Sequence, residues 1–443
     1  MPGPPSESPE TLLVTALAAG GDGVARLESG RVVFVEGGVP GDRVELASLQ
    51  ERRGTLRARI GRIAVPSGDR VEPACPHFTD CGGCTWQHVR YAAQLEAKRE
   101  IVRAAIERIG GLRFEREIEI VASPDAYHYR ARTRIVEAEG GVGYRRRASN
   151  EAMRVESCPV LVPALQAALA AQGQRVAAAQ ARGRGAAARR APDGRPRGPS
   201  GRARGRAAAL REWVITAGSE GPARIAAVGE LAERPGAGGS REEGAIGDAP
   251  GGEVAIGVLG ERLRIGGPGF IQGNALLWER LASEVVACCL RPRSGEAPRR
   301  FVELYAGIGF FTLPLARRGL SGIAVESDPQ AVADLVFNLS RAGLSDAVTP
   351  FEAQVERRID LPTWLVETDL LLVDPPRAGL DAIVRESIAK SGPGIVVYVS
   401  CDPATLARDL KPLVAEGYRI ESIVAFDLFP QTPHVETVVR LER

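Results

Sequence analysis

The sequence predicts an α/β protein in three parts: a small N-terminal β-barrel, a central α+β region with a cysteine cluster, and a C-terminal doubly wound α/β domain. Short alternating strands between glycine-rich turns indicate the barrel, and strand-like segments that alternate with helical ones indicate the last domain. A chain of 443 residues is also too long for one typical core. The predicted boundaries are 8–67 for the barrel, 68–267 for the central region and 268–443 for the C-terminal domain.

The composition is typical of a globular protein. With 44% hydrophobic and 25% charged residues, and no apolar run near about twenty residues, we expect no membrane span. The first residues, MPGPP, lack the basic patch and apolar run of a secretion signal, so we expect a cytoplasmic location. The net charge of +2 does not by itself indicate a nucleic-acid partner, and the distribution of charge has to decide.

The barrel prediction depends on residues 10–66. Apolar and polar positions alternate there, for example in 31–35 and 42–46, and glycine-rich turns separate the strands. Small barrels of this kind often hold single-stranded nucleic acid, but they also serve as plain protein-binding modules.

In the central region a helix is predicted for residues 91–109, because apolar residues recur at helical spacing and Gly110 and Gly111 follow. Residues 115–160 alternate like strands. Their segment 127–134, YHYRARTR, interleaves aromatic and arginine side chains. Such a mixture suits base stacking and phosphate binding, and it suits the polar face of a strand equally well.

A low-complexity insertion covers about 170–252. Between Arg182 and Arg206 it has nine arginines and one acid, Asp193, with almost no large apolar residue, so we expect this segment to be disordered. It could tether RNA or simply be a surface insertion. Residues 210–215 within it resemble one short strand.

Strands are predicted in the C-terminal domain at 301–306, 321–326, 370–374 and 395–400. The first runs into the glycine turn of FVELYAGIG, at residues 301–309, where Gly307 and Gly309 would let the backbone approach a ligand. The second ends at Glu326, whose carboxylate is placed to accept hydrogen bonds from ribose hydroxyls. Because the full three-glycine phosphate fingerprint is absent, the pattern favours S-adenosylmethionine over a dinucleotide.

Three further motifs carry a specific resemblance. They are DPPRAGL at 374–380, YVSCDPATLARDL at 398–410 and FPQTPHVET at 429–437. Together they resemble the RNA 5-methyluridine methyltransferase family, which implies a Rossmann-like methyltransferase domain. The resemblance implies that Cys401 is the covalent nucleophile and Glu436 the proton acceptor. It also implies four residues that bind S-adenosylmethionine, namely Gln272, Tyr305, Glu326 and Asp374.

The N-terminal half extends the resemblance. Residues 20–59 are similar to the TRAM barrel that many members carry as an RNA-binding module. The four cysteines that resemble the ligands of a [4Fe-4S] cluster in some members are Cys75, Cys81, Cys84 and Cys158. Four thiolates could also hold zinc, but the family favours the cluster, in a structural role. The substrate implied is RNA, with 23S ribosomal RNA favoured over transfer RNA, and a monomer is the default.

The number of cysteines and the position of the remaining two give two further predictions. Seven cysteines, an odd number, argue against a disulfide framework. Cys288 and Cys289 lie in an apolar helical run and are expected to act as small hydrophobes.

Two positions depart from the family pattern. Phe310 stands where a polar residue is common, and Gln354 stands near the expected adenine-binding acid, so that packing or Glu356 would have to recognise the adenine. One alternative is therefore a nonenzymatic RNA-binding or folding factor with a degenerate methyltransferase domain. Another is an amino-group methyltransferase that uses 374–376 as its active motif and does not need Cys401.

Overall fold

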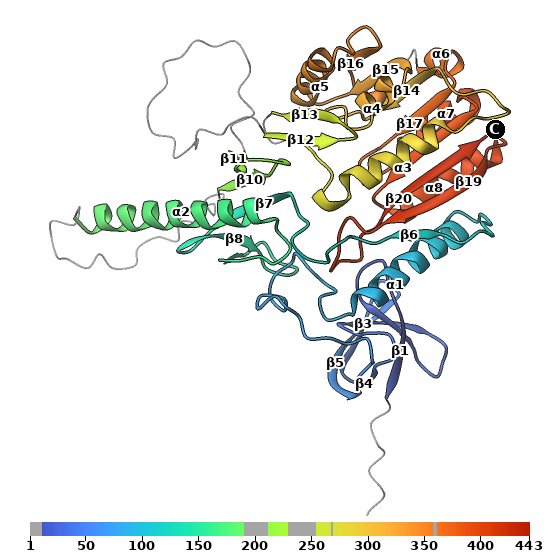
Figure 1. Ribbon diagram of the computed structural model, residues 1–443. Helices are drawn as coiled ribbons and strands as arrows, with labels where there is room; N and C mark the ends of the chain where they lie inside the picture. Colours follow the sequence, from blue (N-terminus) through green and yellow to red (C-terminus); the bar gives the residue numbers. More distant parts are fainter. Residues whose placement is uncertain (1–10, 190–210, 229–253, 267–268, 358–360) are drawn as a thin grey trace, which may run out of the picture.

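The computed structural model describes residues 11–189, 211–228, 254–266, 269–357 and 361–443. Figure 1 shows three parts: a barrel at one end, a central sheet beside the long helix α2, and a large C-terminal sheet with helices on both faces. The α/β fold class predicted from the sequence is confirmed. No helix in these described segments is long and apolar enough to span a bilayer.

The N-terminal barrel is closed, in the strand order β1-β2-β3-β5-β4. Alternate residues point inward, as the period of two in a strand requires, so that Val14, Val33, Val35 and Val44 are fully buried. Its strands are β1 (Leu12–Leu17), β2 (Gly23–Arg26), β3 (Val32–Glu36), β4 (Arg43–Arg52) and β5 (Thr55–Val65).

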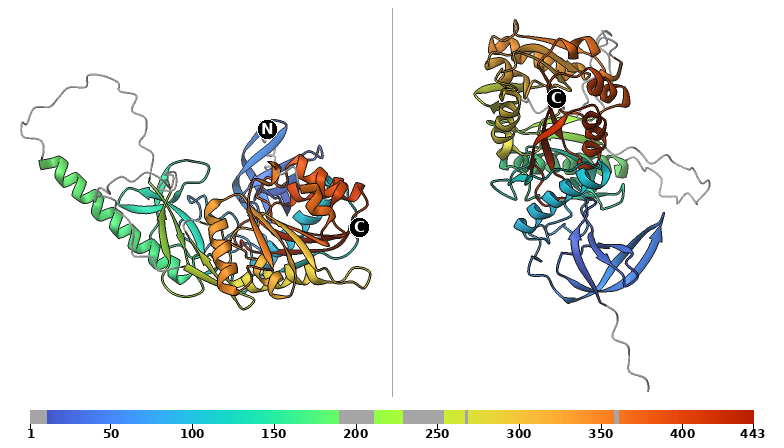
Figure 2. Two further views of the ribbon diagram at one scale, coloured as in Figure 1. Left: turned by 90° about the horizontal axis from the view of Figure 1, so that it is seen from above. Right: turned by 90° about the vertical axis from the view of Figure 1, so that its right-hand side faces the viewer.

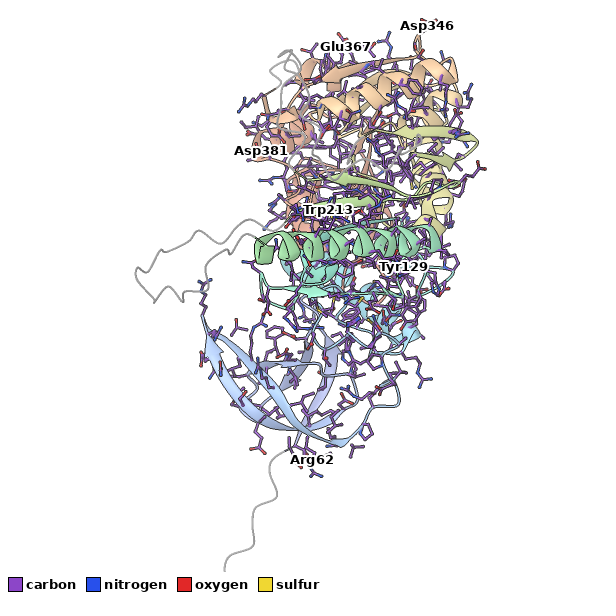
Figure 3. All side chains as sticks on the ribbon, turned by 90° about the vertical axis from the view of Figure 1, so that its left-hand side faces the viewer. Arg62, Tyr129, Trp213, Asp346, Glu367 and Asp381 are labelled. Carbon is purple, nitrogen blue, oxygen red and sulfur yellow. The ribbon has the colours of Figure 1, made fainter. Side chains whose placement is uncertain are left out.

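The central region holds a five-stranded sheet in the order β11-β10-β7-β8-β9. Its strands are β7 (Arg132–Ala138), β8 (Gly141–Arg145), β9 (Ala152–Arg154), β10 (Glu212–Thr216) and β11 (Arg224–Ala227). Strand β10 is the short strand expected near 210–215. Trp213, on this strand, is buried in a core shared with α2, and Figure 3 shows it beside that helix.

Helix α2 (Pro163–Arg189) corrects one expectation. Residues 170–189, predicted to be disordered, are helical, because alanine has the highest helix propensity and needs no core of its own. Leu165, Leu169 and Val176 recur at helical spacing and bury one side of α2 against the sheet. Strand β11 (Arg224–Ala227) likewise lies in the segment expected to be disordered, whereas 190–210 and 229–253 lie outside the described residues.

The C-terminal sheet has eight strands in the order β16-β15-β14-β17-β18-β20-β19-β6. Besides β6 (Glu119–Val121), the strands are β14 (Arg300–Leu304), β15 (Ser321–Glu326), β16 (Val348–Glu352), β17 (Leu370–Val373), β18 (Ile395–Ser400), β19 (Arg419–Phe426) and β20 (Glu436–Glu442). The first five of these are parallel to one another, whereas β20 is antiparallel to both of its neighbours. The chain leaves β14 toward β15 and returns to β17 on its other side, so a crevice is expected at the carboxyl ends of β14 and β17.

Helices cover both faces of this sheet (Figures 1 and 2). The buried core on one face includes α3 (Trp278–Leu290), α4 (Thr312–Arg317) and α5 (Pro329–Ala342). The core on the other face includes η1 (Ala105–Ile109), α6 (Leu361–Val366), α7 (Ala382–Ser391) and α8 (Pro403–Ala415). Two single turns complete this domain, η3 (Ala275–Leu277) and η4 (Val355–Arg357). Cys288 and Cys289 are buried in α3, as the apolar run indicates.

Two segments from the predicted central region pack with the C-terminal sheet. Strand β6 (Glu119–Val121) pairs with β19 and forms the edge of the sheet. The hairpin of β12 (Val254–Val258) and β13 (Glu261–Ile265) contributes its buried residues to the same core as α3. Helix α1 (Tyr91–Ala104), which continues into η1, joins the barrel side of the molecule to this domain.

Candidate active site

The carboxyl ends of four parallel strands bring the predicted site residues to one edge of the sheet. Tyr305 follows β14, Glu326 ends β15, Asp374 follows β17 and Cys401 follows β18. This is the edge at which the strand order reverses, where open α/β sheets bind their ligands.

The turn after β14 adopts left-handed backbone conformations, with φ angles of 65° at Tyr305, 57° at Gly307 and 94° at Gly309. Such values suit glycine but are strained for tyrosine, and strain of this kind concentrates at functional sites. A Cβ atom on Gly309 would stand 2.5 Å from a methyl carbon of Leu313, whereas Gly307 has open space around that position. The turn therefore needs glycine for two different reasons, and it leaves room for a ligand at Gly307.

Glu326 is fixed by backbone donors. Its Oε2 accepts a hydrogen bond from the N–H of Gly307 at 2.9 Å, and its Oε1 accepts from the N–H groups of Ser327 and Asp328 at 2.6 and 2.8 Å. An ionised carboxylate offers about four lone-pair sites. The hydroxyl of Ser327 is a further donor to Oε1, at 3.3 Å, so three donors surround Oε1 and only the N–H of Gly307 bonds Oε2. Oε2 is therefore the oxygen of Glu326 that keeps acceptor capacity for a ribose hydroxyl, and its orientation is set by the glycine turn.

Gln272 and Asp374 meet across the crevice. The side-chain amide of Gln272 donates to Oδ2 of Asp374 at 3.1 Å, and its backbone oxygen accepts from the indole N–H of Trp278 at 2.8 Å. Burial raises the pKa of Asp374 to about 7, although the bond from Gln272 acts in the opposite direction. A carboxyl group that titrates near neutrality in a crevice is a common sign of a functional site.

Cys401 and Glu436 are brought together by strand register. Ser400 at the end of β18 pairs with Thr437 of β20, so one further residue along the antiparallel ladder places Cys401 opposite Glu436. Burial, and then the neighbouring Asp374, hold the pKa of Glu436 well above its ordinary value. Burial and the charge of Glu436 raise the pKa of the Cys401 thiol to about 12. The site thus crowds three acids together: the charge of Asp374 raises the pKa values of Glu436 and Cys401, and the charge of Glu436 raises that of Cys401.

Two basic residues that the motifs contain, but that the sequence analysis did not single out, complete this cluster. Arg377 lowers the pKa values of both Cys401 and Glu436 through its positive charge. A guanidinium nitrogen of Arg377 lies 2.8 Å from Nδ1 of His434. Burial lowers the pKa of His434 to about 4, so the imidazole is neutral near pH 7 and its Nδ1 accepts from Arg377. Both residues could have been singled out from the sequence, because they lie in the motifs at 374–380 and 429–437.

The two departures from the family pattern have structural explanations. Phe310 is buried in the core and stacks edge-on against Phe311, with ring centroids 5.0 Å apart. Glu356 accepts a hydrogen bond from the hydroxyl of Tyr305 at 3.1 Å, which places an acid beside the glycine turn even though position 354 holds glutamine.

The aromatic side chains of the segment 127–134 do not all lie at the surface. Tyr129 is fully buried, and its hydroxyl donates to the backbone oxygen of Pro430 at 2.9 Å, so this aromatic ring is a core residue rather than a base-stacking surface.

The four predicted ligand cysteines lie within electrostatic range of one another. The charge of Cys75 raises the pKa values of Cys81 and Cys158. The charges of Cys81 and Cys158 in turn raise the pKa of Cys84. Burial raises the pKa of Cys84 to about 11 and those of Cys81 and Cys158 in the same direction, whereas the charge of Arg130 lowers all three. Cys158 and the cysteine segment 75–84, at least 74 residues apart in the sequence, thus converge on one place.

Polar donors surround these sulfurs. The N–H of Gly83 lies 3.4 Å from the sulfur of Cys81, Gln87 bonds Cys84, and the hydroxyl of Tyr144 bonds Cys158. Donors of this kind stabilise thiolate ligands. Within the described part of the chain, however, no three His, Cys, Asp or Glu side chains form a group arranged to hold a single metal ion.

Comparison with known proteins agrees with this arrangement. Residues 263–443 match the tRNA (uracil-5-)-methyltransferase family, and residues 10–60 match the TRAM domain. The 23S rRNA (uracil(1939)-C(5))-methyltransferase RlmD of Edwardsiella ictaluri is 33% identical over 454 aligned residues, covering 100% of this chain and 98% of the relative. An uncharacterized RNA methyltransferase of Gloeobacter violaceus is 35% identical over 451 residues, covering 98% of this chain and 96% of that protein.

The fold has a solved counterpart along its whole length. It is the Pyrococcus abyssi tRNA (uracil-54, C5)-methyltransferase, whose crystal structure contains S-adenosyl-L-homocysteine; its TM-score is 0.68 at 23% identity, and the match covers 98% of this chain and 100% of that one. Since the Edwardsiella ictaluri relative is 33% identical over the whole of this chain, and the barrel and the C-terminal domain of this chain match the two family models, the chain belongs to the RNA (uracil-5-)-methyltransferase family.

Proposed function

We propose that this protein methylates C5 of a specific uridine in RNA, with Cys401 as covalent nucleophile and Glu436 as the base. The observation that supports the proposal is that β18 and β20 pair up to Ser400 and Thr437, the residues next to Cys401 and Glu436, and that Glu436 lies close enough for its charge to raise the pKa of the Cys401 thiol. C5 of uracil is a poor nucleophile until a group adds to C6, and a thiolate is well suited to that addition.

Each step has a residue for it. The sulfur of Cys401 bonds to C6, and the electron pair of the C5–C6 double bond moves into an enolate. Gln272, Glu326 and Asp374 would hold S-adenosylmethionine, which would supply a methyl group on a positively charged sulfur. As C5 takes the methyl group, the methyl–sulfur bond breaks and its electron pair leaves with the sulfur, which gives S-adenosylhomocysteine with a neutral sulfur. Glu436 then removes the proton from C5, the double bond re-forms, and the C6–S bond breaks to return the thiolate.

The electrostatics of the site support these roles. The raised pKa of Glu436 makes its carboxylate a stronger base than an exposed glutamate. The thiol of Cys401 is protonated at neutral pH, and positive charge must favour its ionisation. Arg377 supplies part of that charge from within the chain.

For the substrate we propose 23S ribosomal RNA rather than transfer RNA. The support is the full-length relative from Edwardsiella ictaluri, whose name specifies 23S rRNA, whereas the transfer-RNA enzyme with a similar structure is only 23% identical. Because the target base lies in a structured RNA, we expect it to leave its stack to reach the crevice. We further propose that the protein acts as a cytoplasmic monomer.

We also propose that Cys75, Cys81, Cys84 and Cys158 hold a [4Fe-4S] cluster. The support is the convergence of four thiols, three of them with a hydrogen-bond donor beside the sulfur. A four-iron cluster takes four thiolates. The methyl transfer needs no electron, so the role of these cysteines is to fix the segment 75–90 against the central sheet.

The test uses two substitutions and unmodified 23S rRNA with labelled S-adenosylmethionine. Cys401→Ala is expected to abolish both 5-methyluridine and any denaturation-stable protein–RNA adduct. Glu436→Gln is expected to abolish turnover yet accumulate the adduct, because C6–S cleavage waits for removal of the C5 proton. The control is Glu442→Gln at the far end of β20, about 20 Å away along the strand. An active Cys401→Ala variant would point to the amino-group mechanism, and cofactor binding without product in the wild type would favour the nonenzymatic reading.

A further inference from the structure

The loop between β19 and β20 leads directly to Glu436. We call residues 427–435 the catalytic loop. At its centre Gln431 has a φ angle of 68°, a left-handed conformation that glutamine rarely adopts. A non-glycine residue keeps such a conformation only where its surroundings hold it. The surroundings here come from the other end of the sequence.

Gln94 on helix α1 holds Gln431 from two sides. Its Oε1 accepts from the backbone N–H of Gln431 at 2.9 Å, and its Nε2 donates to the side-chain oxygen of Gln431, also at 2.9 Å. The same Nε2 lies 3.1 and 2.8 Å from the backbone oxygens of Trp86 and Val89, so its two N–H groups are shared among three acceptors. Gln94 is fully buried, so water cannot replace these bonds.

A buried ion pair holds the start of the loop. Lys98, one turn along α1 from Gln94, bonds Asp427, and both side chains are inaccessible to solvent. The ammonium group of Lys98 also donates to the backbone oxygen of Phe429 at 3.0 Å. Tyr129 adds the bond to Pro430, and Figure 3 shows Tyr129 in the middle of the molecule, between the barrel and the C-terminal domain.

Trp86 connects the same loop to the barrel and to the cysteine segment. It lies two residues after Cys84, and its backbone N–H donates to the oxygen of Gln431 at 2.9 Å. Its indole N–H donates to the backbone oxygen of Gly21, in the barrel, at 2.9 Å. The barrel, the cysteine segment and the catalytic loop therefore meet at the buried side chain of Trp86 and at Gln431.

From these contacts we infer that Gln94 and Trp86 are positioning residues for Glu436, so that the N-terminal half sets the rate of proton removal and does not merely bind RNA. This inference rests on the proposed function. Gln94 is placed to act through Gln431, five residues before Glu436, and does not itself need to touch the RNA or the methyl donor. Loss of its bonds frees the loop and lets the carboxylate move from its place opposite Cys401.

The proposal predicts a specific kinetic defect in Gln94→Leu. Addition of Cys401 and methyl transfer precede the step that needs Glu436, so turnover should fall by about tenfold or more while the covalent adduct accumulates on unmodified RNA. Affinity for RNA and for S-adenosylmethionine should stay within about twofold of the wild type. A purely structural role predicts the opposite pattern, in which adduct and product fall together.

A second variant and a matched control make the result decisive. Gln431→Gly removes the side-chain bond to Gln94 but suits the left-handed backbone, so it tests loop positioning without leaving Gln94 unpaired. The control is Gln180→Leu on α2, whose amide likewise joins three groups of a hairpin but lies away from the site. Turnover equal to wild type in both Gln94→Leu and Gln431→Gly overturns the inference. A wild type that forms neither adduct nor 5-methyluridine overturns the proposed function instead.

Discussion

Glu303 provides a prediction whose size follows from the structure. Glu303 lies on β14, just before the glycine turn, and the residue is 2% exposed. Its Oε2 accepts a hydrogen bond from the hydroxyl of Thr312 at 2.6 Å. Burial raises the pKa of Glu303 from 4.5 to about 8, and the carboxylates of Asp374 and Glu326 act in the same direction. The folded protein therefore favours the protonated form.

The sign of the pH dependence follows from that shift. A carboxyl group whose pKa is raised by folding stabilises the protein fully below its unfolded pKa, and this stability is lost as pH rises through the folded value. For Glu303 the window runs from 4.5 to about 8. Since one pKa unit corresponds to about 1.4 kcal/mol, Glu303 should lower the free energy of unfolding by about 3 kcal/mol between roughly pH 5.5 and pH 8.

Glu303→Gln removes this titration and keeps an acceptor for Thr312. Urea unfolding at several pH values should show that the variant loses about 3 kcal/mol less stability than the wild type between roughly pH 5.5 and pH 8. The control is Glu352→Gln at the exposed end of β16, which should leave the wild-type pH dependence unchanged. Parallel curves for Glu303→Gln and the wild type would refute the reasoning.

Three other substitutions test separate parts of the account. Gly309→Ala should weaken S-adenosylmethionine binding and lower the free energy of unfolding by more than Gly319→Ala does. Both glycines have positive φ angles, but only Gly309 lacks space for a Cβ atom. Calorimetry measures the binding, and urea unfolding measures the stability. Cys84→Ser should lower the iron content and visible absorbance of anaerobically purified protein, and Cys288→Ser should leave both unchanged; equal iron in the two variants would contradict the ligand assignment. Arg377→Gln should shift the alkaline rise of adduct formation to higher pH, since this guanidinium lowers the pKa of the nucleophilic thiol, and an unshifted profile would rule that role out.

Sequence patterns predicted the central strands of the C-terminal domain well, because β17 and β18 are buried on both faces and read as continuous apolar runs. The segments 321–326 and 395–400 coincide with β15 and β18. The insertion was harder, because composition alone cannot distinguish an alanine-rich disordered segment from α2. Strand β6 could not be predicted to join the C-terminal sheet, since its pairing with β19 joins residues about 300 positions apart.

The candidate site divides in the same way. The glycine turn and Glu326 follow from local pattern, because each lies at the end of a predicted strand. Cys401 and Glu436 required the resemblance, since a lone cysteine at a strand end is usually a packing residue. The contact of Gln94 with Gln431 spans 337 positions and has no local signal at all. Only the three-dimensional structure shows that the N-terminal half reaches the loop that carries the base.

The most direct test of the account is to map 5-methyluridine after incubation of the anaerobically purified protein with labelled S-adenosylmethionine and unmodified 23S rRNA or transfer RNA. The account predicts label at one uridine of 23S rRNA, and no label with Cys401→Ala. Label that persists in Cys401→Ala would contradict the covalent mechanism. Absence of label in both RNAs with the wild type, despite bound cofactor, would contradict the proposed activity itself.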